Sequence, residues 1–305
     1  MKPTVIASLA LAFASAASAA AAPPATIPTA ATPTLRFGVV SFYNPRLMYI
    51  KYQPLIDYLN AHTGRHWELV IGPSYERTVE DLCSGALTVA YLGPYTYERA
   101  HARCGALPVV KLNTGGQPTY RSLIMVRADN PIKSLQELAG QRFGFGSPMS
   151  TSSHLMPRAM LAAAGLRPGV NLACRYYFHH ERAARAVLLG EVDACGVRDI
   201  VGEKFTHRGL RILATSEPMP NFPFVLAPNS PAALRDELFT TLVEQPVVDP
   251  ATAAVIRGWD EELSGGFVAA SDAEYAPIRR LAIRVFGPRA LTLGEAQLEC
   301  GPGKS

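Results

Sequence analysis

One cluster of side chains in this sequence is suited to holding a small anion. Four hydroxyl residues, Ser150–Ser153, follow one another between a strand-like stretch and a helix-like stretch. Pro157 restricts where that helix begins, because proline is tolerated only in the first turn. The hydroxyls therefore fall at a helix N-terminus, where free N–H groups and the positive end of the helix dipole favour an anion. A plain serine N-cap is the alternative explanation for any one of them.

Two series of alternating strands and helices must position this cluster. The expected strands are 35–40, 67–71, 88–92, 109–112, 122–126, 142–145, 175–178, 192–197 and 211–213. This rhythm predicts an α/β fold with two lobes, each a mostly parallel sheet flanked by helices. Lobe 1 is expected over residues 35–127 and 220–290, lobe 2 over 128–219, and a C-terminal tail over 291–305. The crossings between lobes are expected near 126–130 and 218–228.

The composition excludes several classes of protein. The 305 residues are 18% charged, whereas an ordinary soluble domain has about 25%. The net charge of +4 comes without any block of like charges, which excludes a nucleic-acid-binding arm. The histidines and cysteines lack zinc-ligand spacing, and Gly144-Phe145-Gly146 lacks the third glycine of a dinucleotide fingerprint. We therefore expect no metal and no cofactor.

The first 34 residues are expected to target the protein rather than to fold. A lysine precedes the apolar run 5–14, and the small residues Ala17-Ser18-Ala19 follow it. This pattern predicts a secretory signal peptide over residues 1–19, cleaved after Ala19, and a flexible leader over 20–34. The run is shorter than the roughly 20 residues that span a bilayer. An uncleaved anchor or a disordered tail is the alternative.

Export allows disulfides among the five cysteines, because such bonds persist outside the cytoplasm. Cys83 and Cys104 each end an expected helix at the same edge of the sheet, which favours a bond between them. Cys174 and Cys195 have the same separation in the sequence but lie in or beside successive strands. A strand between those two would place them ~10 Å apart, beyond the Cα limit of roughly 7 Å. That second pair is therefore less favoured, and Cys300 is left over.

Short motifs follow one another in a fixed order between residues 35 and 287. They are FGVVSFYNPR (37–46), YQPL (52–55), GPYTY (93–97), YRS (120–122), STSSHLMP (150–157), FHHE (178–181), GEVDA (190–194) and GF (266–267). Together they resemble the phosphonate, phosphite and phosphate substrate-binding family of ABC transporters. The resemblance implies a periplasmic-binding-protein-like clam-shell that closes on a small tetrahedral oxyanion.

The resemblance also implies which side chains hold the ligand. From lobe 2 they are the hydroxyls of Ser150, Thr151 and Ser152 and a ring N–H of His180. From lobe 1 they are the phenols of Tyr43 and of Tyr95 or Tyr97. Such neutral donors at a helix end can select an anion by geometry without a buried salt bridge.

The sequence departs from the family pattern at two places. Ser153 stands where the family usually has glycine, and Arg198 stands where it often has an acidic or amide residue. If Arg198 faces the cleft, it favours a fully ionised ligand. If it faces solvent, the adjacent Asp199 can accept from a protonated ligand oxygen. The acidic run 260–262 is expected on a solvated helix face.

The main hypothesis is a monomeric binding protein that delivers an oxyanion to an ABC permease in the inner membrane and performs no chemistry on it. A second hypothesis is a periplasmic sensor for a membrane histidine kinase, and the thiols leave room for arsenite as its ligand. A third is a hydrolase that uses Ser150, although no G-x-S-x-G elbow surrounds that serine.

Overall fold

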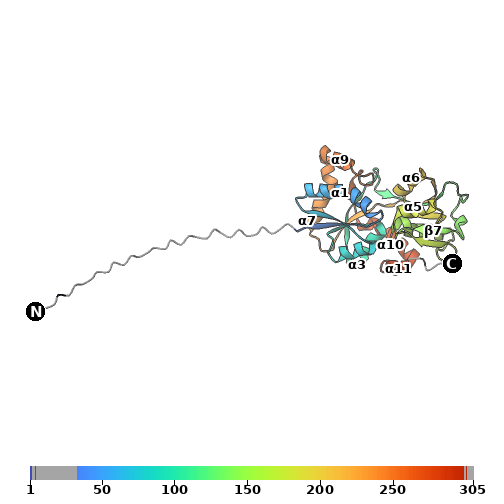
Figure 1. The fold of residues 1–305 in the computed structure, drawn as a ribbon, viewed down its shortest axis with the longest axis horizontal. Helices are drawn as coiled ribbons and strands as arrows, with labels where there is room; N and C mark the ends of the chain where they lie inside the picture. Colours follow the sequence, from blue (N-terminus) through green and yellow to red (C-terminus); the bar gives the residue numbers. More distant parts are fainter. Residues whose placement is uncertain (2–3, 5–32, 299, 301–305) are drawn as a thin grey trace. The chain divides into compact units, whose positions relative to one another are not determined.

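The computed structural model describes Met1, Thr4, residues 33–298 and Cys300. It contains two large mixed sheets flanked by helices (Figure 1). The predicted two-lobed α/β class is confirmed, but the expectation of mostly parallel sheets is wrong, because strands next to the crossings pair antiparallel in both sheets. Nearly all of the predicted signal peptide and leader lies outside the described residues. Within these residues, no helix is long and apolar enough to cross a membrane.

The first sheet has six strands. Across the sheet they are β13 (Phe267–Ala269), β4 (Leu107–Leu112), β12 (Pro223–Leu226), β3 (Val89–Tyr91), β1 (Leu35–Val39) and β2 (Trp67–Ile71). Strand β1 is parallel to β2 and β3, while β12 is antiparallel to both of its neighbours. The centre of β1 is fully buried because helices cover both faces of the sheet.

Local signals explain where the helices of this sheet begin and end. They are α1 (Pro45–His62), α2 (Tyr75–Cys83) and α3 (Pro94–Cys104). Asn44 caps α1 by accepting from the Leu47 N–H at 3.0 Å, and α1 starts on a proline. Helix α3 also starts on a proline and ends at Gly105, whose left-handed φ of 72° suits glycine.

The second sheet carries the hydroxyl run. Its strands, in order, are β10 (Leu210–Thr215), β6 (Ser122–Arg127), β9 (Ala194–Arg198), β7 (Arg142–Phe145) and β8 (Ala173–Tyr176). Its helices are η1 (Gln136–Leu138), η2 (Thr151–Leu155), α4 (Met156–Ala163), α5 (His180–Leu188) and α6 (Asp199–Thr206). Strand β7 is parallel to β8 and β9, but β6 is antiparallel to β9 and β10. In each sheet, therefore, the strand that follows a crossing between the lobes runs against its neighbours.

The crossings form a small sheet of their own. Strands β5 (Thr119–Tyr120) and β11 (Met219–Pro220) pair antiparallel between the two lobes. The second crossing lies in the expected region, but the first lies before the expected 126–130, and β6 belongs to the second sheet. The predicted boundary of lobe 1 at residue 127 therefore needs correction. The sequence could not place β6, because an apolar strand buried on both faces has the same pattern in either sheet.

The C-terminal part of the chain contacts both lobes. It contains α7 (Ala232–Phe239), η3 (Thr240–Glu244), α8 (Gln245–Val248), α9 (Pro250–Arg257), α10 (Asp272–Phe286) and α11 (Glu295–Leu298). Helix α10 packs against α3 of the first lobe and α4 of the second. Beyond α10, the Arg99 side chain of α3 donates to the carbonyls of Ala290 and Leu293. We name residues 287–298 together with Cys300 the C-terminal strap.

Four of the five cysteines form disulfides. Cys83 and Cys104, the favoured pair, join the ends of α2 and α3 with a Cα–Cα distance of 5.6 Å. Cys174 of β8 is bonded to Cys300, with a Cα–Cα distance of 6.4 Å, so the less favoured Cys174–Cys195 pair is wrong. Strand β7 lies between β8 and β9 and keeps Cys174 from Cys195, which is a buried free thiol.

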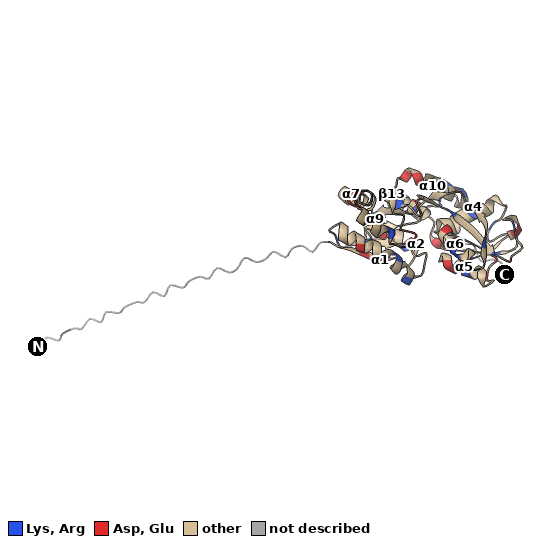
Figure 2. Ribbon diagram, turned by 90° about the horizontal axis from the view of Figure 1, so that it is seen from above, with Lys and Arg blue, Asp and Glu red and all other residues tan. Residues whose placement is uncertain are grey.

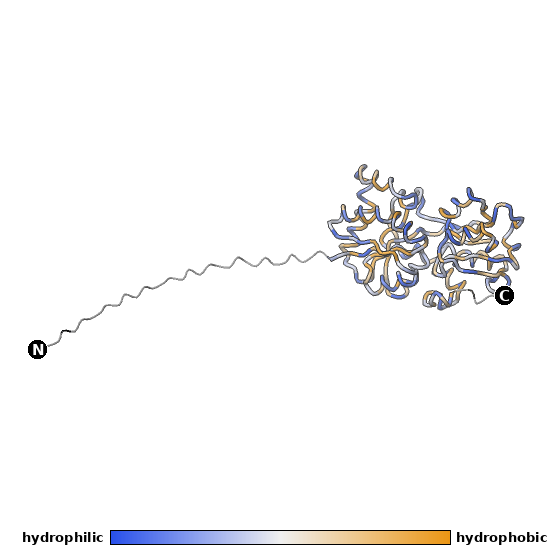
Figure 3. The backbone as a smooth tube through the Cα atoms, in the orientation of Figure 1, coloured by the Kyte–Doolittle hydropathy of each residue, from blue (hydrophilic) through white to orange (hydrophobic). Residues whose placement is uncertain are grey.

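Hydropathy and charge follow the layers. The most hydrophobic parts of the chain are the strands inside each lobe, and the outer helices alternate between hydrophobic and hydrophilic residues (Figure 3). Basic and acidic residues lie interspersed over the helices and loops of both lobes (Figure 2). The two lobes therefore present mixed charge, as the absence of like-charge blocks in the sequence predicts.

Candidate ligand-binding site

Ser150 begins the helix predicted after the loop. Its backbone is extended, and its Oγ accepts from the Ser153 N–H at 3.1 Å, which makes it the N-cap. Residues Thr151–Leu155 form a wider π-helical turn that continues into α4, with Pro157 in the first turn of α4. The hydroxyl run therefore lies at a helix N-terminus, where several backbone N–H groups lack intrahelical partners.

Ser153 holds this loop against the second sheet. Its Oγ accepts from the Gly146 N–H at 2.7 Å and donates to the Gly196 carbonyl at 2.6 Å. The approach is so close that a Cβ on Gly146 would lie 2.4 Å from the same Oγ. The serine at position 153 therefore supplies two hydrogen bonds that fix the loop.

The other three hydroxyls of the run differ in what they contact. Ser150 Oγ lies 3.2 Å from His180 Nε2, and Thr151 Oγ1 accepts from the Tyr95 N–H of the first lobe at 2.8 Å. Ser152 Oγ is buried and has no hydrogen-bond partner among the described residues. Leaving a buried polar atom unpaired costs about 1–3 kcal/mol, so Ser152 is the hydroxyl of this loop most in need of a ligand.

His180 faces the same loop as a neutral ring. It is the first residue of α5, and its Nδ1 accepts from the Arg198 N–H at 3.1 Å. Burial, with the positive charge of Arg198 as a second cause, lowers the pKa of His180 to about 3. Because Nδ1 accepts, the neutral ring carries its proton on Nε2, toward Ser150. The predicted ring N–H therefore lies on Nε2, directed at Ser150 Oγ in the hydroxyl run.

The three predicted tyrosines separate into two groups. Tyr43 is 1% exposed, and its phenol oxygen has no partner among the described residues. Tyr95 instead donates to the Ala290 carbonyl at 2.7 Å, and Tyr97 donates to Asp272 Oδ1 at 2.6 Å. The expectation that the phenol of Tyr95 or Tyr97 binds the ligand is therefore corrected: the contact of this turn with the hydroxyl loop is the backbone N–H of Tyr95.

Arg198 is buried, so the alternative in which it faces solvent is excluded. Its side chain is 1% exposed and forms an ion pair with Glu262, which is also 1% exposed. Nη2 donates to Asn221 Oδ1 at 3.1 Å, and the guanidinium lies 4.4 Å from the ring centre of Phe222. Arg198 belongs to the second sheet and Glu262 to the first lobe, so this ion pair joins the two lobes.

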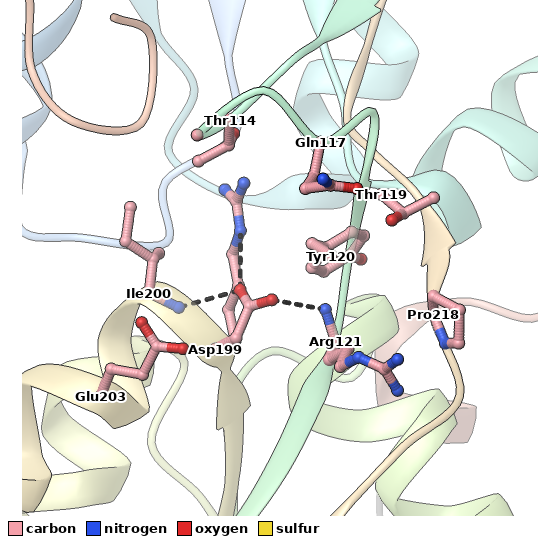
Figure 4. A pocket seen from close by; sticks show the side chains of 11 residues that line it. Thr114, Gln117, Thr119, Tyr120, Arg121, Asp199, Ile200, Glu203 and Pro218 are labelled. Atoms are coloured by element: carbon pink, nitrogen blue, oxygen red, sulfur yellow. Dashed lines mark hydrogen bonds and ion pairs between the residues drawn. The ribbon is translucent and has the colours of Figure 1, made fainter. Parts of the chain in front are cut away.

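Asp199 lies at the edge of the same region. Its carboxylate accepts from the backbone N–H groups of Arg121 at 2.6 Å and Ile200 at 2.9 Å (Figure 4). Together with Tyr120 and Arg198 it lines a pocket of about 590 Å³ beside the crossing strands. The carboxylate lies 3.9 Å from Arg198 Nε. Asp199 is thus held by backbone donors at the edge of this pocket, next to the buried Arg198–Glu262 ion pair.

Three residues of the site lie outside the ligand set that the resemblance implies. The phenol oxygens of Tyr52 and Tyr120 are buried without partners among the described residues, as is Glu262 Oε2. The expectation of a solvated helix face over 260–262 is wrong for Glu262. Its charge adds to burial in raising the pKa values of Tyr43 and Tyr52, and the Tyr52 ring lies 5.4 Å from the ring of Tyr91, whose hydroxyl donates to Glu262. The only sequence signal for the burial of Glu262 was weak, namely that it directly precedes the apolar Leu263.

The geometry argues against two of the earlier hypotheses. A Ser150 hydrolase needs a histidine oriented by a carboxylate, but Nδ1 of His180 accepts a backbone N–H and Asp199 bonds to backbone donors. Arsenite binding was suggested by free thiols, but four cysteines are paired and Cys195 is buried. Burial also raises the pKa of the Cys195 thiol, which disfavours the reactive thiolate.

Comparison with known proteins identifies the family. Residues 37–275 match the family described as ABC transporter, phosphonate, periplasmic substrate-binding protein. The chain belongs to this family. The expectations of a periplasmic location and of a binding protein that is not an enzyme are therefore confirmed.

Two curated members of the family align with the chain. A phosphate-import protein PhnD of Mycolicibacterium smegmatis is 31% identical over 182 residues, which is 56% of this chain and 57% of the relative. The chain thus spans little more than half of that relative's length. A phosphonates-binding periplasmic protein of Escherichia coli is 24% identical over 93% of this chain and 85% of its own length.

Solved structures show the same fold. A binding protein component of an ABC phosphonate transporter from Pseudomonas aeruginosa superposes with a TM-score of 0.74 at 21% identity, covering 88% of this chain and 92% of that one. PhnD1 of Prochlorococcus marinus, solved in complex with methylphosphonate, has the same TM-score at 16% identity, covering 83% and 98%. At these identities the likeness concerns the fold.

Proposed function

We propose that this protein captures a small tetrahedral oxyanion (a phosphonate, phosphite or phosphate) in the periplasm and delivers it to an ABC permease in the inner membrane. The supporting observation is a group of buried, unpartnered donors contributed by both lobes: Ser152 Oγ, Tyr43 Oη and Tyr120 Oη, with the His180 ring next to the same loop. The family and the named ligands of its members support the same class of ligand.

The arrangement explains how such an anion can be held. Hydrogen bonds from neutral donors to a charged oxygen contribute about 1.5–3 kcal/mol each. The three hydroxyls are unpartnered without a ligand, so binding removes a desolvation cost at the same time. Because the donors come from two lobes, they reach one ligand only when the lobes are closed, which couples binding to hinge closure.

The leader and the oligomeric state complete the proposal. Residues 1–19 act as a signal peptide cleaved after Ala19, and residues 20–34 form a leader ahead of a monomeric two-lobed body. N-terminal sequencing of the exported protein tests the cleavage site, and light scattering tests the monomer. The sensor alternative shares the ligand site, and it is distinguished by whether the loaded protein binds a permease or a histidine kinase.

Titration calorimetry of the mature protein with phosphate, phosphite and methylphosphonate tests the ligand class. We expect at least one of them to bind and Ser152→Ala to weaken it by tenfold or more, because one donor to a charged oxygen is lost. Ser84→Ala, a substitution of an exposed serine at the end of α2, is the matched control and should leave the affinity unchanged. If no oxyanion binds the wild-type protein, the proposed function is wrong.

A further inference from the structure

Glu262 has one oxygen that the protein uses and one that it does not. Oε1 accepts from Tyr91 Oη at 2.5 Å and pairs with Arg198. Oε2 is buried and has no hydrogen-bond partner among the described residues. A buried carboxylate oxygen without a donor is costly, because charged groups lose more on desolvation than neutral ones. This oxygen therefore has no donor within the described residues and is open to one from a ligand.

The surroundings of this oxygen are otherwise rich in donors. Tyr52 lies with its ring 5.4 Å from that of Tyr91, which bonds to Glu262, and Tyr43 packs on the same Phe42 ring as Tyr91. Both Tyr43 and Tyr52 carry unpartnered phenol oxygens, and the charge of Glu262 helps to raise the pKa of both. Arg198 Nε also has no hydrogen-bond partner among the described residues, yet none of these donors is hydrogen-bonded to Oε2, which leaves it the unused acceptor of the cluster. Arg198 neutralises Glu262, so the buried pair adds no net charge to balance a fully ionised ligand.

We infer that Glu262 Oε2 accepts the acid proton of a partly protonated oxyanion, so that the site selects hydrogen-bearing anions such as hydrogen phosphate over sulfate. This inference rests on the proposed function and specifies its ligand class. The ligand's ionised oxygens accept from the hydroxyls, and its remaining O–H donates to Glu262. Sulfate has the same shape but carries no proton at neutral pH, so it leaves Oε2 unpaired and adds repulsion between two negative oxygens.

The inference is specific to a proton rather than to an ammonium group. An amino-substituted phosphonate would also offer a donor to Oε2, but its positive charge would lie beside the Arg198 guanidinium that pairs with the same carboxylate. We therefore expect methylphosphonate to bind more tightly than an amino-substituted phosphonate. The opposite order would assign Oε2 to an ammonium group and overturn the inference.

The wild-type protein supplies the first test, which does not depend on the folding of any variant. In calorimetric titrations at pH 7, sulfate should bind at least a hundredfold more weakly than phosphate, and arsenate should resemble phosphate because it keeps an acid proton. Equal affinities for sulfate and phosphate contradict the inference. If neither of them binds, nor phosphite or methylphosphonate, the proposed function itself fails.

The variant Glu262→Gln supplies the second test. Its amide oxygen can still accept from Tyr91 and Arg198, while its NH2 group replaces the unused acceptor with a donor. We expect the ratio of sulfate to phosphate affinity to rise by at least tenfold. Glu261→Gln is the matched control, because Glu261 is its neighbour, is half exposed and also pairs across the lobes, with Lys204. An unchanged ratio in a Glu262→Gln protein with a normal thermal melt refutes the role of Glu262.

Discussion

The two sides of the candidate site are built differently. On the second lobe, the hydroxyl loop is held by its own hydrogen bonds: Ser150 Oγ accepts from the Ser153 N–H, and Ser153 Oγ accepts from the Gly146 N–H and donates to the Gly196 carbonyl. On the first lobe, the buried phenols of Tyr43 and Tyr52 have no partner among the described residues. Apart from Ser152, the loop on the second lobe is therefore organised by its own bonds, whereas the phenols of the first lobe need the ligand to satisfy their polar groups.

This difference indicates how affinity and stability are divided. Groups already paired within the protein contribute to folding, whereas unpaired groups are costs that a ligand removes. Substitutions on the first lobe should therefore change affinity more than stability. Substitutions that loosen the loop should change both.

The largest effect is expected at the ion pair that joins the two sides. Arg198→Met leaves Glu262 buried without its partner, and breaking a buried pair in this way costs about 3–5 kcal/mol. Urea unfolding measures the loss. Lys204→Met, which breaks the more exposed pair with Glu261, is the control and should cost less than about 1 kcal/mol. If both variants lose a similar amount of unfolding free energy, the buried pair contributes no more than the exposed one, and this prediction is wrong.

A smaller effect on stability, but a strong one on binding, is expected for Gly146→Ala. The new Cβ would lie 2.4 Å from Ser153 Oγ and 2.9 Å from Ser153 Cβ, so the loop must shift. Overpacking of this kind costs about 1–3 kcal/mol. Thermal unfolding and phosphate titration should both record losses. Gly93→Ala is the control, since its Cβ would meet only ordinary contacts at 3.5 Å, and a Gly146 variant that behaves like it would mean that the loop is not rigid.

The smallest effects on stability are expected from two substitutions that remove a phenol hydroxyl, one unpaired and one paired within the protein. Tyr43→Phe removes an unpaired hydroxyl, so its melting temperature should stay level or rise while affinity falls by about tenfold or more. Tyr97→Phe removes a bond to Asp272, so it should lose about 1 kcal/mol of stability and keep its affinity. Melting temperature and phosphate affinity should be measured for both variants. Reduced affinity in the Tyr97 variant would contradict the assignment of Tyr43, rather than Tyr97, as a ligand donor.

The sequence predicted the parts of the site that depend on local signals. Pro157 limits where the helix can start, so the position of the hydroxyl run at an N-terminus followed from the chain itself. The alternation of apolar segments likewise predicted the two lobes. The π-helical turn over Thr151–Leu155 was not predicted, because its wider spacing depends on the packing of Ser153 against Gly146 and Gly196.

The rest depends on contacts between distant segments. Arg198 and Asp199 are adjacent at the end of β9, and neighbouring side chains there point in different directions, so a one-residue uncertainty decides which one is buried. Glu262 becomes buried only because Arg198 and Tyr91 arrive from elsewhere in the chain. The partner of Cys174 is likewise 126 residues away, and no local pattern indicates it.

The C-terminal strap changes the mechanics of the lobes. Two paired crossings, β5 and β11, would leave a hinge free to bend and to twist. The strap adds a third connection, since its carbonyls at Ala290 and Leu293 bind Arg99 of the first lobe and its last described residue is covalently joined to Cys174 of the second. Three connections at separate points restrict relative rotation more than two adjacent ones do. We therefore expect the lobes to open by rocking rather than by twisting, with the Cys174–Cys300 disulfide making the third connection covalent.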